Sequence, residues 1–508
     1  MPLHDRSLVS AFLSIFGGKM ATLVTSVVFT PLLVRLLGSG NYGDYAFLMS
    51  VFGLLMVLAN SGIAEGLRKY LPEQDSPRWH SRVFGFYARV SFVLCLLVTL
   101  PLIALSSVGF FGLIGDDFAA YFRLTAVLVI VSQLAKVVKN TLMALGYEHV
   151  SEPLLVVEQF VYSAIALALA YVGYGITGVL LGYIIAMAIS VGIGSTFLVK
   201  IIDVYGVLRK NVDVPRRQMM LFNVLSIVLS LLMISLYNFD VLLLRPIAGD
   251  NQTGYYKSAL VVAQFVWIVP IAIQTLLLHS TAQLWNEGDH STLNMIASRA
   301  TKYTLVTTTL IIVGLATLAD DFIPLYFGAD FAVAVTPMIL LLPGVLGFAV
   351  ARPIFAIGQA SGRLRVLIIA TGSTASLNVI LNLLLIPPYG MNGAAVATSI
   401  GYGSMAVTYV YAARVIGFDP TNELKLARIA ASSLVTLVVL LALDSLVAGR
   451  ILSLAVLPVI GGIVYSGLIF QTRVVTIKEA NQALDELPDP ISVFGKRIVG
   501  GYERILLS

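Results

Sequence analysis

Charged side chains are scarce in this sequence. Only 12% of its 508 residues are Asp, Glu, Lys or Arg, about half the fraction of a typical soluble domain, whereas 58% are hydrophobic. The apolar residues come in repeated runs of about twenty or more, the length at which a helix crosses a bilayer. This composition excludes a soluble globular protein and predicts an all-α polytopic membrane protein.

The residues of redox and metal chemistry are also few. The single cysteine, Cys95, lies inside an apolar run, which excludes a disulfide framework and a Cys-based metal site. The five histidines are scattered over different loops and helix ends, without metal-ligand spacing. Glycine-rich strings such as residues 173–178 lie at apolar helices rather than in phosphate-binding loops. We therefore expect no enzyme, no catalytic residue, no metal site and no cofactor.

Hydropathy predicts about fourteen transmembrane helices. The expected spans are residues 8–33, 45–64, 83–106, 120–145, 153–172, 176–199, 219–244, 255–278, 301–319, 334–358, 365–386, 392–413, 427–447 and 451–470. Lys and Arg gather in the short loops after even-numbered spans, whereas the opposite loops hold mostly Asp. The net charge of +5 therefore reflects topology and not nucleic-acid binding, and it predicts a multi-pass cell membrane protein with both termini in the cytoplasm.

Four short motifs recur at nearly one spacing, which indicates an internal repeat. Residues 35–45 resemble 245–256, 117–119 match 330–332, 143–146 resemble 355–358, and 174–178 resemble 389–393, all at offsets of 211 to 215. An offset through six spans predicts parallel halves with a substrate site between them. The expected parts are a six-helix lobe (1–200), a cytoplasmic connecting loop (201–218), a second six-helix lobe (219–414), two additional helices (415–470) and a cytoplasmic tail (471–508).

One predicted span carries a polar stripe. Within the apolar run 124–145, Gln133, Lys136 and Asn140 recur at helical spacings of three and four, with Lys139 beside them. A lysine near mid-bilayer costs roughly 2.5–3.5 kcal/mol on insertion scales, so such residues usually face a cavity or another helix. We expect Lys136 and Lys139 to bind an anion and Gln133 and Asn140 to line the same cavity. The alternative for Lys139 is that it reaches the membrane interface.

Other charged residues within the spans complete the candidate set. Lys19 lies deep in the first span, and Arg352 occupies the position in the second half that corresponds to Lys139, although it could also be an interfacial anchor. Glu158 and Asp240 are candidate coupling carboxylates, because a buried carboxylate neutralises a cation or carries a proton. Glu65, beside basic residues, is interpreted as part of a surface network.

These features resemble a known family. The motif at 35–45, the run at 388–398 and fourteen spans are similar to the polysaccharide transport branch, including the Wzx-type oligosaccharide flippases, of the multidrug/oligosaccharidyl-lipid/polysaccharide exporter superfamily. The resemblance implies a flippase for polyprenyl-phosphate- or pyrophosphate-linked oligosaccharide, used in cell-surface polysaccharide biosynthesis. It also implies a basic cavity, here formed by Lys19, Lys136, Lys139 and Arg352, and two extra helices that serve the lipid tail.

Two other functions stay open from the sequence. A cation-coupled multidrug exporter of the same superfamily would need an acidic cavity, and a membrane scaffold for polysaccharide enzymes would leave the deep cations unexplained. The expected partners are the bilayer, the lipid-linked oligosaccharide and, as a further possibility, a polymerase or glycosyltransferases. We also expect the two extra helices to pack against the second half, and residues 491–506 to form an interfacial amphipathic helix.

Overall fold

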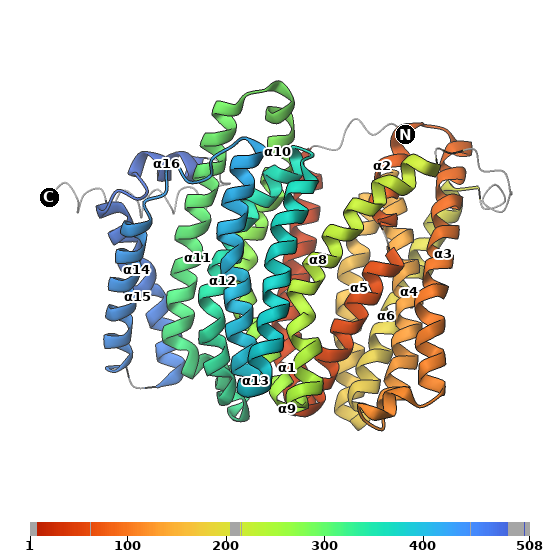
Figure 1. The fold of residues 1–508 in the computed structure, drawn as a ribbon, viewed down its shortest axis with the longest axis horizontal. Coiled ribbons are helices and arrows are strands. Elements are labelled where there is room, and N and C mark those ends of the chain that lie inside the picture. The colour runs from red at the N-terminus through yellow and green to blue at the C-terminus, as the bar shows by residue number, and fades with distance from the viewer. Residues whose placement is uncertain are drawn as a thin grey trace. The chain divides into compact units, whose positions relative to one another are not determined.

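The computed structural model describes residues 8–60, 62–203, 214, 216–447, 449–485 and 502. The side chains of residues 8–20, 113, 216–218, 220–226, 279 and 482–485 are outside this description. All regular elements in the described part of the chain are helices, as Figure 1 shows. The predicted fold class, an all-α polytopic membrane protein, is confirmed.

The chain forms two compact units. The first comprises Met1–Lys257 and Asn382–Ala394, and the second comprises Ser258–Leu381 and Ala395–Ser508. The first unit therefore includes α8 and the beginning of α9, which the sequence repeat assigns to the second lobe. The division into two six-helix lobes, with the other expected parts, stays a prediction.

The first unit contains both long and short helices. They are α1 (Leu8–Asn60), α2 (Ile63–Tyr70), η1 (Leu71–Glu73), α3 (Pro77–Ser107), η2 (Phe110–Leu113), α4 (Phe118–Ala144), α5 (Glu148–Leu169), η3 (Ala170–Tyr174), α6 (Gly175–Ile201) and α8 (Arg216–Ala248). Helix α9 (Asp250–Gln264) begins in this unit.

The second unit continues with helices of similar length. They are η4 (Phe265–Trp267), α10 (Ile268–Glu287), α11 (His290–Phe327), η5 (Ala329–Ala334), α12 (Val335–Ala360), α14 (Leu426–Asp444), α15 (Arg450–Gln471) and α16 (Ile477–Asp485). Helix α13 (Leu364–Ile416) belongs to this unit except for the segment Asn382–Ala394.

Eleven helices in the described residues are long and apolar enough to cross a membrane. Three of them are 53 or 54 residues long, more than twice the ~20 residues that one crossing needs. Each of these three contains a glycine with positive φ, at Gly38, Gly173 or Gly390, where the helical geometry is interrupted. When each is counted as two crossings, the described part of the chain has the fourteen predicted crossings.

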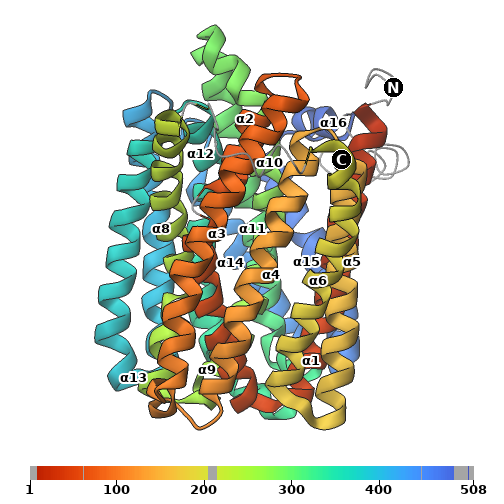
Figure 2. The same cartoon turned by 90° about the vertical axis from the view of Figure 1, so that its right-hand side faces the viewer.

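Packing contacts show that two of these long helices, at Gly38 and at Gly173, are hairpins. The ring centroids of Phe29 and Tyr162 are 4.9 Å apart, and the Tyr45 hydroxyl lies 2.6 Å from that of Tyr162. A straight helix would separate residues 29 and 45 by about 24 Å at 1.5 Å per residue. The chain therefore turns back between them, at Gly38. Helices α5 and α6 likewise pack along each other (Figure 2).

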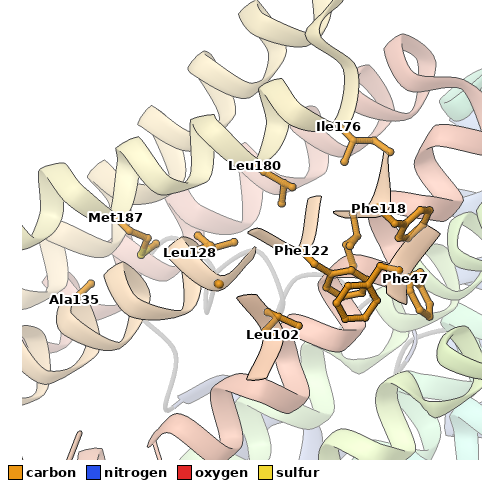
Figure 3. Close-up of a cluster of buried hydrophobic side chains, with 12 residues drawn as sticks. Phe47, Leu102, Phe118, Phe122, Leu128, Ala135, Ile176, Leu180 and Met187 are labelled. Atoms are coloured by element: carbon orange, nitrogen blue, oxygen red, sulfur yellow. The ribbon is translucent and has the colours of Figure 1, made fainter. Parts of the chain in front are cut away.

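A hydrophobic cluster in the first unit joins α1, α3, α4 and α6 (Figure 3). Phe47 of α1 packs edge-on against Phe118 of α4, with 5.9 Å between ring centroids. Leu180 of α6 and Leu128 of α4 belong to the same cluster. Met187 of α6 belongs to it too and also lines a cavity. This packing fixes α4 and α6 beside the candidate site.

The two additional helices pack against α11 of the second unit. Val313 of α11 clusters with Leu440 of α14 and Leu457 of α15. Because α11 lies within residues 219–414, the expected packing against the second half is confirmed. The amphipathic helix expected at 491–506 lies outside the described residues, apart from Tyr502, whose hydroxyl donates to the Ile463 carbonyl at 2.6 Å.

Candidate functional site

A cavity of about 470 Å³ lies within the first unit. Its wall is built by α1, α2, α4, α5, α6 and α8, and α4 contributes Ser132, Lys136 and Lys139. At 3.6 residues per turn, these three positions fall within an arc of about 60° on α4. The structure therefore places both predicted lysines of the polar stripe on one cavity wall.

The Lys139 ammonium is paired inside this cavity. Its Nζ lies 2.5 Å from Oε2 of Glu158 on α5, and the two side chains are 14% and 6% exposed. A buried ion pair of this kind offsets the desolvation of both charges only while both partners are present. Glu158, predicted as a coupling carboxylate, is thus the anion that Lys139 meets in the protein.

Lys136 differs from its neighbour on α4. It lines the same cavity and is half-buried, but no carboxylate of the described residues lies within ion-pair distance of its ammonium. The exposed side chain of Glu65 on α2 also lines the cavity, although the sequence suggested only a surface role. Among the described residues, Lys136 is therefore the cation of this cavity that is available to a ligand.

Several buried polar atoms around the cavity make no hydrogen bond to any described residue. They include Oγ of Ser132, Oδ1 of Asn60 and Oε1 of Glu158. Leaving such an atom unsatisfied costs about 1–3 kcal/mol, so a polar cavity surface of this type favours a ligand with hydrogen-bonding groups. The cavity can hold an anion at Lys136 and hydroxyl or amide groups beside it.

Gln133 and Asn140 lie beside the lysine face of α4, with their midpoint about 80° round the helix from the midpoint of Lys136 and Lys139. Gln133 is fully buried, and its Nε2 donates to Oγ of Ser91 on α3 at 3.0 Å. Nδ2 of Asn140 donates to the Lys136 carbonyl at 2.7 Å. Neither residue lines the described cavity, and their assignment to a polar cavity stays a prediction.

The remaining candidates are not gathered at this cavity in the described structure. Asp240 of α8 is buried and accepts hydrogen bonds from the Tyr256 hydroxyl and, at 2.7 Å, from the Val241 amide. Arg352 of α12 belongs to the second unit. The side chain of Lys19 lies outside the described residues, so its cavity role stays a prediction.

Arg352 is nevertheless held in a defined environment. Its guanidinium carbon lies 4.0 Å from the ring centroid of Phe348, and its Nη1 donates to Oε1 of Gln274 at 3.1 Å. Stacking and directed donation are typical of a positioned arginine rather than one that extends to a membrane interface. Its assignment as a cavity cation stays a prediction.

The sequence analysis did not predict the aromatic cluster beside the lysines. Tyr162 of α5 and Tyr183 of α6 have ring centroids 4.6 Å apart, and Tyr183 lines the cavity. One pattern in the sequence could have indicated part of this cluster. On α5, Glu152, Gln159 and Tyr162 recur at spacings of seven and three, as residues on one helix face do.

A family model described as Polysaccharide biosynthesis protein matches residues 8–277. Among curated proteins, the chain is 22% identical over 415 residues to the probable low-salt glycan biosynthesis flippase Agl15 of Haloferax volcanii. That similarity covers 80% of this chain and 82% of the relative.

Solved membrane transporters share the fold. The lipid II flippase MurJ in an inward closed conformation gives a TM-score of 0.74 at 15% identity, covering 92% of this chain and 100% of that one. An inward-facing multidrug resistance MATE family transporter of the MOP superfamily gives 0.60 at 14% identity, covering 78% and 98%. An outward-facing MATE structure gives 0.56 at 15% identity, covering 80% and 95%.

Proposed function

Because the chain belongs to the polysaccharide biosynthesis protein family, we propose that it is a flippase for polyprenyl-phosphate- or pyrophosphate-linked oligosaccharide. The substrate would move from the inner to the outer leaflet for cell-surface glycan assembly. The observation that carries this proposal is the cavity with Lys136 and Lys139 on one face of α4, inside a multi-pass membrane protein. The similarity to a glycan flippase supports the same reading.

The two lysines would act in sequence. Lys136 has no ion-pair partner among the described residues, so it would contact the phosphate first. The phosphate would then compete with Glu158 for Lys139, since one ammonium cannot fully compensate two anions. Charge-assisted hydrogen bonds of this type contribute about 1.5–3 kcal/mol each. Displacing the carboxylate would leave Glu158 buried and unpaired, which makes it a candidate to bind the coupling ion.

Transport would follow alternating access, in which the cavity opens to one side of the membrane and then to the other. Inward-facing and outward-facing MATE structures with this fold suggest that alternation. The glycan headgroup would travel in the polar cavity while the polyprenyl chain stays in the bilayer. A potential negative inside would favour outward release of an anionic headgroup by about 2.3 kcal/mol per charge per 100 mV.

The direct test is flux in proteoliposomes. Fluorescent lipid-linked oligosaccharide should reach the outer leaflet, whereas a cationic dye should not be exported. Lys136→Gln should lower this flux at equal protein insertion, and exposed Lys478→Gln provides the matched control. Export of the dye, or wild-type flux in Lys136→Gln, would argue for the drug exporter or for a site elsewhere.

A further inference from the structure

A second cavity adjoins the lysine cavity in the first unit. It has a volume of about 290 Å³, near the lower limit of ordinary small-molecule sites. Glu158, Tyr183 and Met187 line both cavities, whereas the lysines line only the first. The two spaces therefore meet at Glu158 and offer different chemistry on its two sides.

Hydrogen-bond acceptors dominate the polar side chains of the second cavity. Glu152 of α5 is 7% exposed and makes no hydrogen bond or ion pair to another described residue. Glu158 is 5% exposed, and its Oε1 has no partner among the described residues while Oε2 accepts from Lys139. Nε2 of Gln159 donates to Oγ of Ser163 at 3.4 Å, which leaves its amide oxygen for a ligand. Ionised carboxylates only accept, so this cavity suits a ligand rich in donors.

Tyrosine rings form another part of the wall. Tyr162 and Tyr183 both line the cavity, with ring centroids 4.6 Å apart and planes inclined by 32°. The Tyr162 ring is fixed by Phe29, 4.9 Å away, and by a 2.6 Å hydroxyl contact with Tyr45. An aromatic surface beside carboxylates matches a sugar ring, whose C–H groups pack on aromatic faces while its hydroxyl groups donate to the acceptors.

We propose that the second cavity binds the sugar residue attached to the phosphate, and that it selects an uncharged or amino sugar over a uronic acid. This inference rests on the proposed function, because the phosphate at Lys136 and Lys139 would bring the first sugar towards Glu158. Glu152 and Glu158 would accept hydrogen bonds from sugar hydroxyl groups. A carboxylate on the sugar would face these two buried carboxylates and be repelled by them. Among the described residues, their only cationic partner is Lys139, which pairs with Glu158.

The titratable groups that the described residues place around the two cavities come from five helices. They are Lys136 and Lys139 on α4, Glu152, Glu158 and Tyr162 on α5, Tyr183 on α6, Tyr45 on α1 and Glu65 on α2. Among the described residues, both cations line the first cavity, which exposed Glu65 also lines, whereas buried Glu152, which has no described ion pair, lines the second. This separation of charge orients the ligand, with phosphate towards α4 and sugar along α5.

Three short-chain ligands test the inference with the full-length protein in nanodiscs. They are a polyprenyl diphosphate, its glucose adduct and its glucuronic acid adduct, which differs from glucose by one carboxylate. The wild type should bind the glucose adduct at least about tenfold more tightly than the glucuronic acid adduct, because like charges in a desolvated site repel strongly.

Two substitutions of opposite charge change test whether these side chains cause the preference for the glucose adduct. Glu152→Gln should reduce the glucose preference several-fold, and Gln159→Glu should increase it. Glu148→Gln, at an exposed position on the same helix, should leave it unchanged. The conservative changes keep side-chain size, and thermal unfolding confirms that each variant is folded.

The outcomes separate this inference from the proposed function. Absence of diphosphate binding in the wild type would overturn the proposed function. Diphosphate binding that depends on Lys136, together with equal affinity for the two sugar adducts, would overturn the sugar subsite alone. Sodium binding that is lost in Glu152→Gln, with the sugar preference unchanged, would also overturn it and identify the cavity as a cation site.

Discussion

At the scale of single residues, the two lysines of α4 differ in what their removal leaves behind. Lys139 is paired with Glu158, and both side chains are largely buried. Lys136 has no ion-pair partner in the described part of the chain. Breaking a buried pair by removing one partner costs about 3–5 kcal/mol, because the other charge stays buried without compensation. Removal of a cation that has no partner carries no such penalty.

We therefore expect Lys139→Gln to lower the unfolding temperature and Lys136→Gln to leave it nearly unchanged. Both should lower flux, since each removes a cation from the cavity. Adding Glu158→Gln to Lys139→Gln should recover stability without recovering flux. The measurements are thermal unfolding of the purified variants and flux normalised to inserted protein. Wild-type stability of Lys139→Gln would contradict the structural role of the pair.

At the scale of elements, α1 and α9 approach each other through two glycines. A Cβ placed on Gly43 would lie 2.0 Å from the Asp250 carbonyl oxygen, and one on Gly254 would lie 2.0 Å from that of Ser39. Ser39 and Asn251, 212 residues apart, contact each other through Oγ and Oδ1 at 2.5 Å. Reciprocal contact between segments that the repeat relates is what a pseudo-twofold axis produces. It supports the proposed parallel repeat.

Gly43→Ala should therefore destabilise the protein, because the new methyl group meets backbone that cannot rotate away. Overpacking costs about 1–3 kcal/mol, which exceeds the gain of ~1 kcal/mol from replacing glycine by alanine in a helix. Gly314→Ala in α11 is the matched control, since its added Cβ would meet no atom within 4 Å. Equal unfolding temperatures for the two variants would show that the close approach is not required.

A second element-scale contact ties α16 to α11. Nζ of Lys302 donates to Glu479 at 2.8 Å and to Glu423 at 3.1 Å. The pKa of Glu479 lies below its usual value. Partial burial raises this pKa, but the hydrogen bonds from Lys302 and Thr476 lower it by more. A depressed carboxyl pKa stabilises the folded state above the unfolded pKa, and this stabilisation is lost as the pH falls through the folded value.

We expect α16 to be docked at neutral pH and to detach when the pH falls below the usual range of glutamate. Hydrogen exchange of residues 477–485 should then increase. Glu479→Gln should show increased exchange already at neutral pH and little further change on acidification. Because truncation after Glu486 retains Glu479, it should leave both docking and flux largely intact. Equal protection of α16 in wild type and Glu479→Gln would contradict this account.

At the scale of the whole molecule, topology follows from charge and not from packing. Residues 201–218 hold more basic than acidic side chains, and the loops on the opposite side of the predicted spans are poorer in Lys and Arg. The positive-inside rule places this segment in the cytoplasm together with both termini. Most of the segment lies outside the described residues, so its sidedness needs a direct test.

A cysteine introduced at Asn211 in a Cys95→Ala background should resist an impermeant thiol reagent on intact cells. It should react once the membrane is permeabilised. The background is suitable because Cys95 is a buried free cysteine. A cysteine at Asp117, expected outside, is the positive control. Labelling at residue 211 in intact cells would reverse the predicted orientation.

The protein class and the predicted crossings follow from the apolar runs of the sequence. Runs of apolar residues have to bury their backbone hydrogen bonds as helices in a bilayer, so their lengths and positions largely define the spans. The cost of placing lysine within such a run also identified Lys136 and Lys139 as candidates. Both inferences depend on local chemistry, which a linear sequence records completely.

The contacts that these residues make depend on how the helices pack against one another. The pairing of Lys139 with Glu158 depends on how α4 and α5 are rotated about their axes, and a rotation of about 100° corresponds to a single residue. The same kind of rotation turns Gln133 of α4 towards Ser91 of α3 and brings Tyr162 and Tyr183 together. In a membrane nearly every helix face is apolar, so the hydrophobic pattern does not specify which face meets which neighbour. Close packing between helices makes that choice.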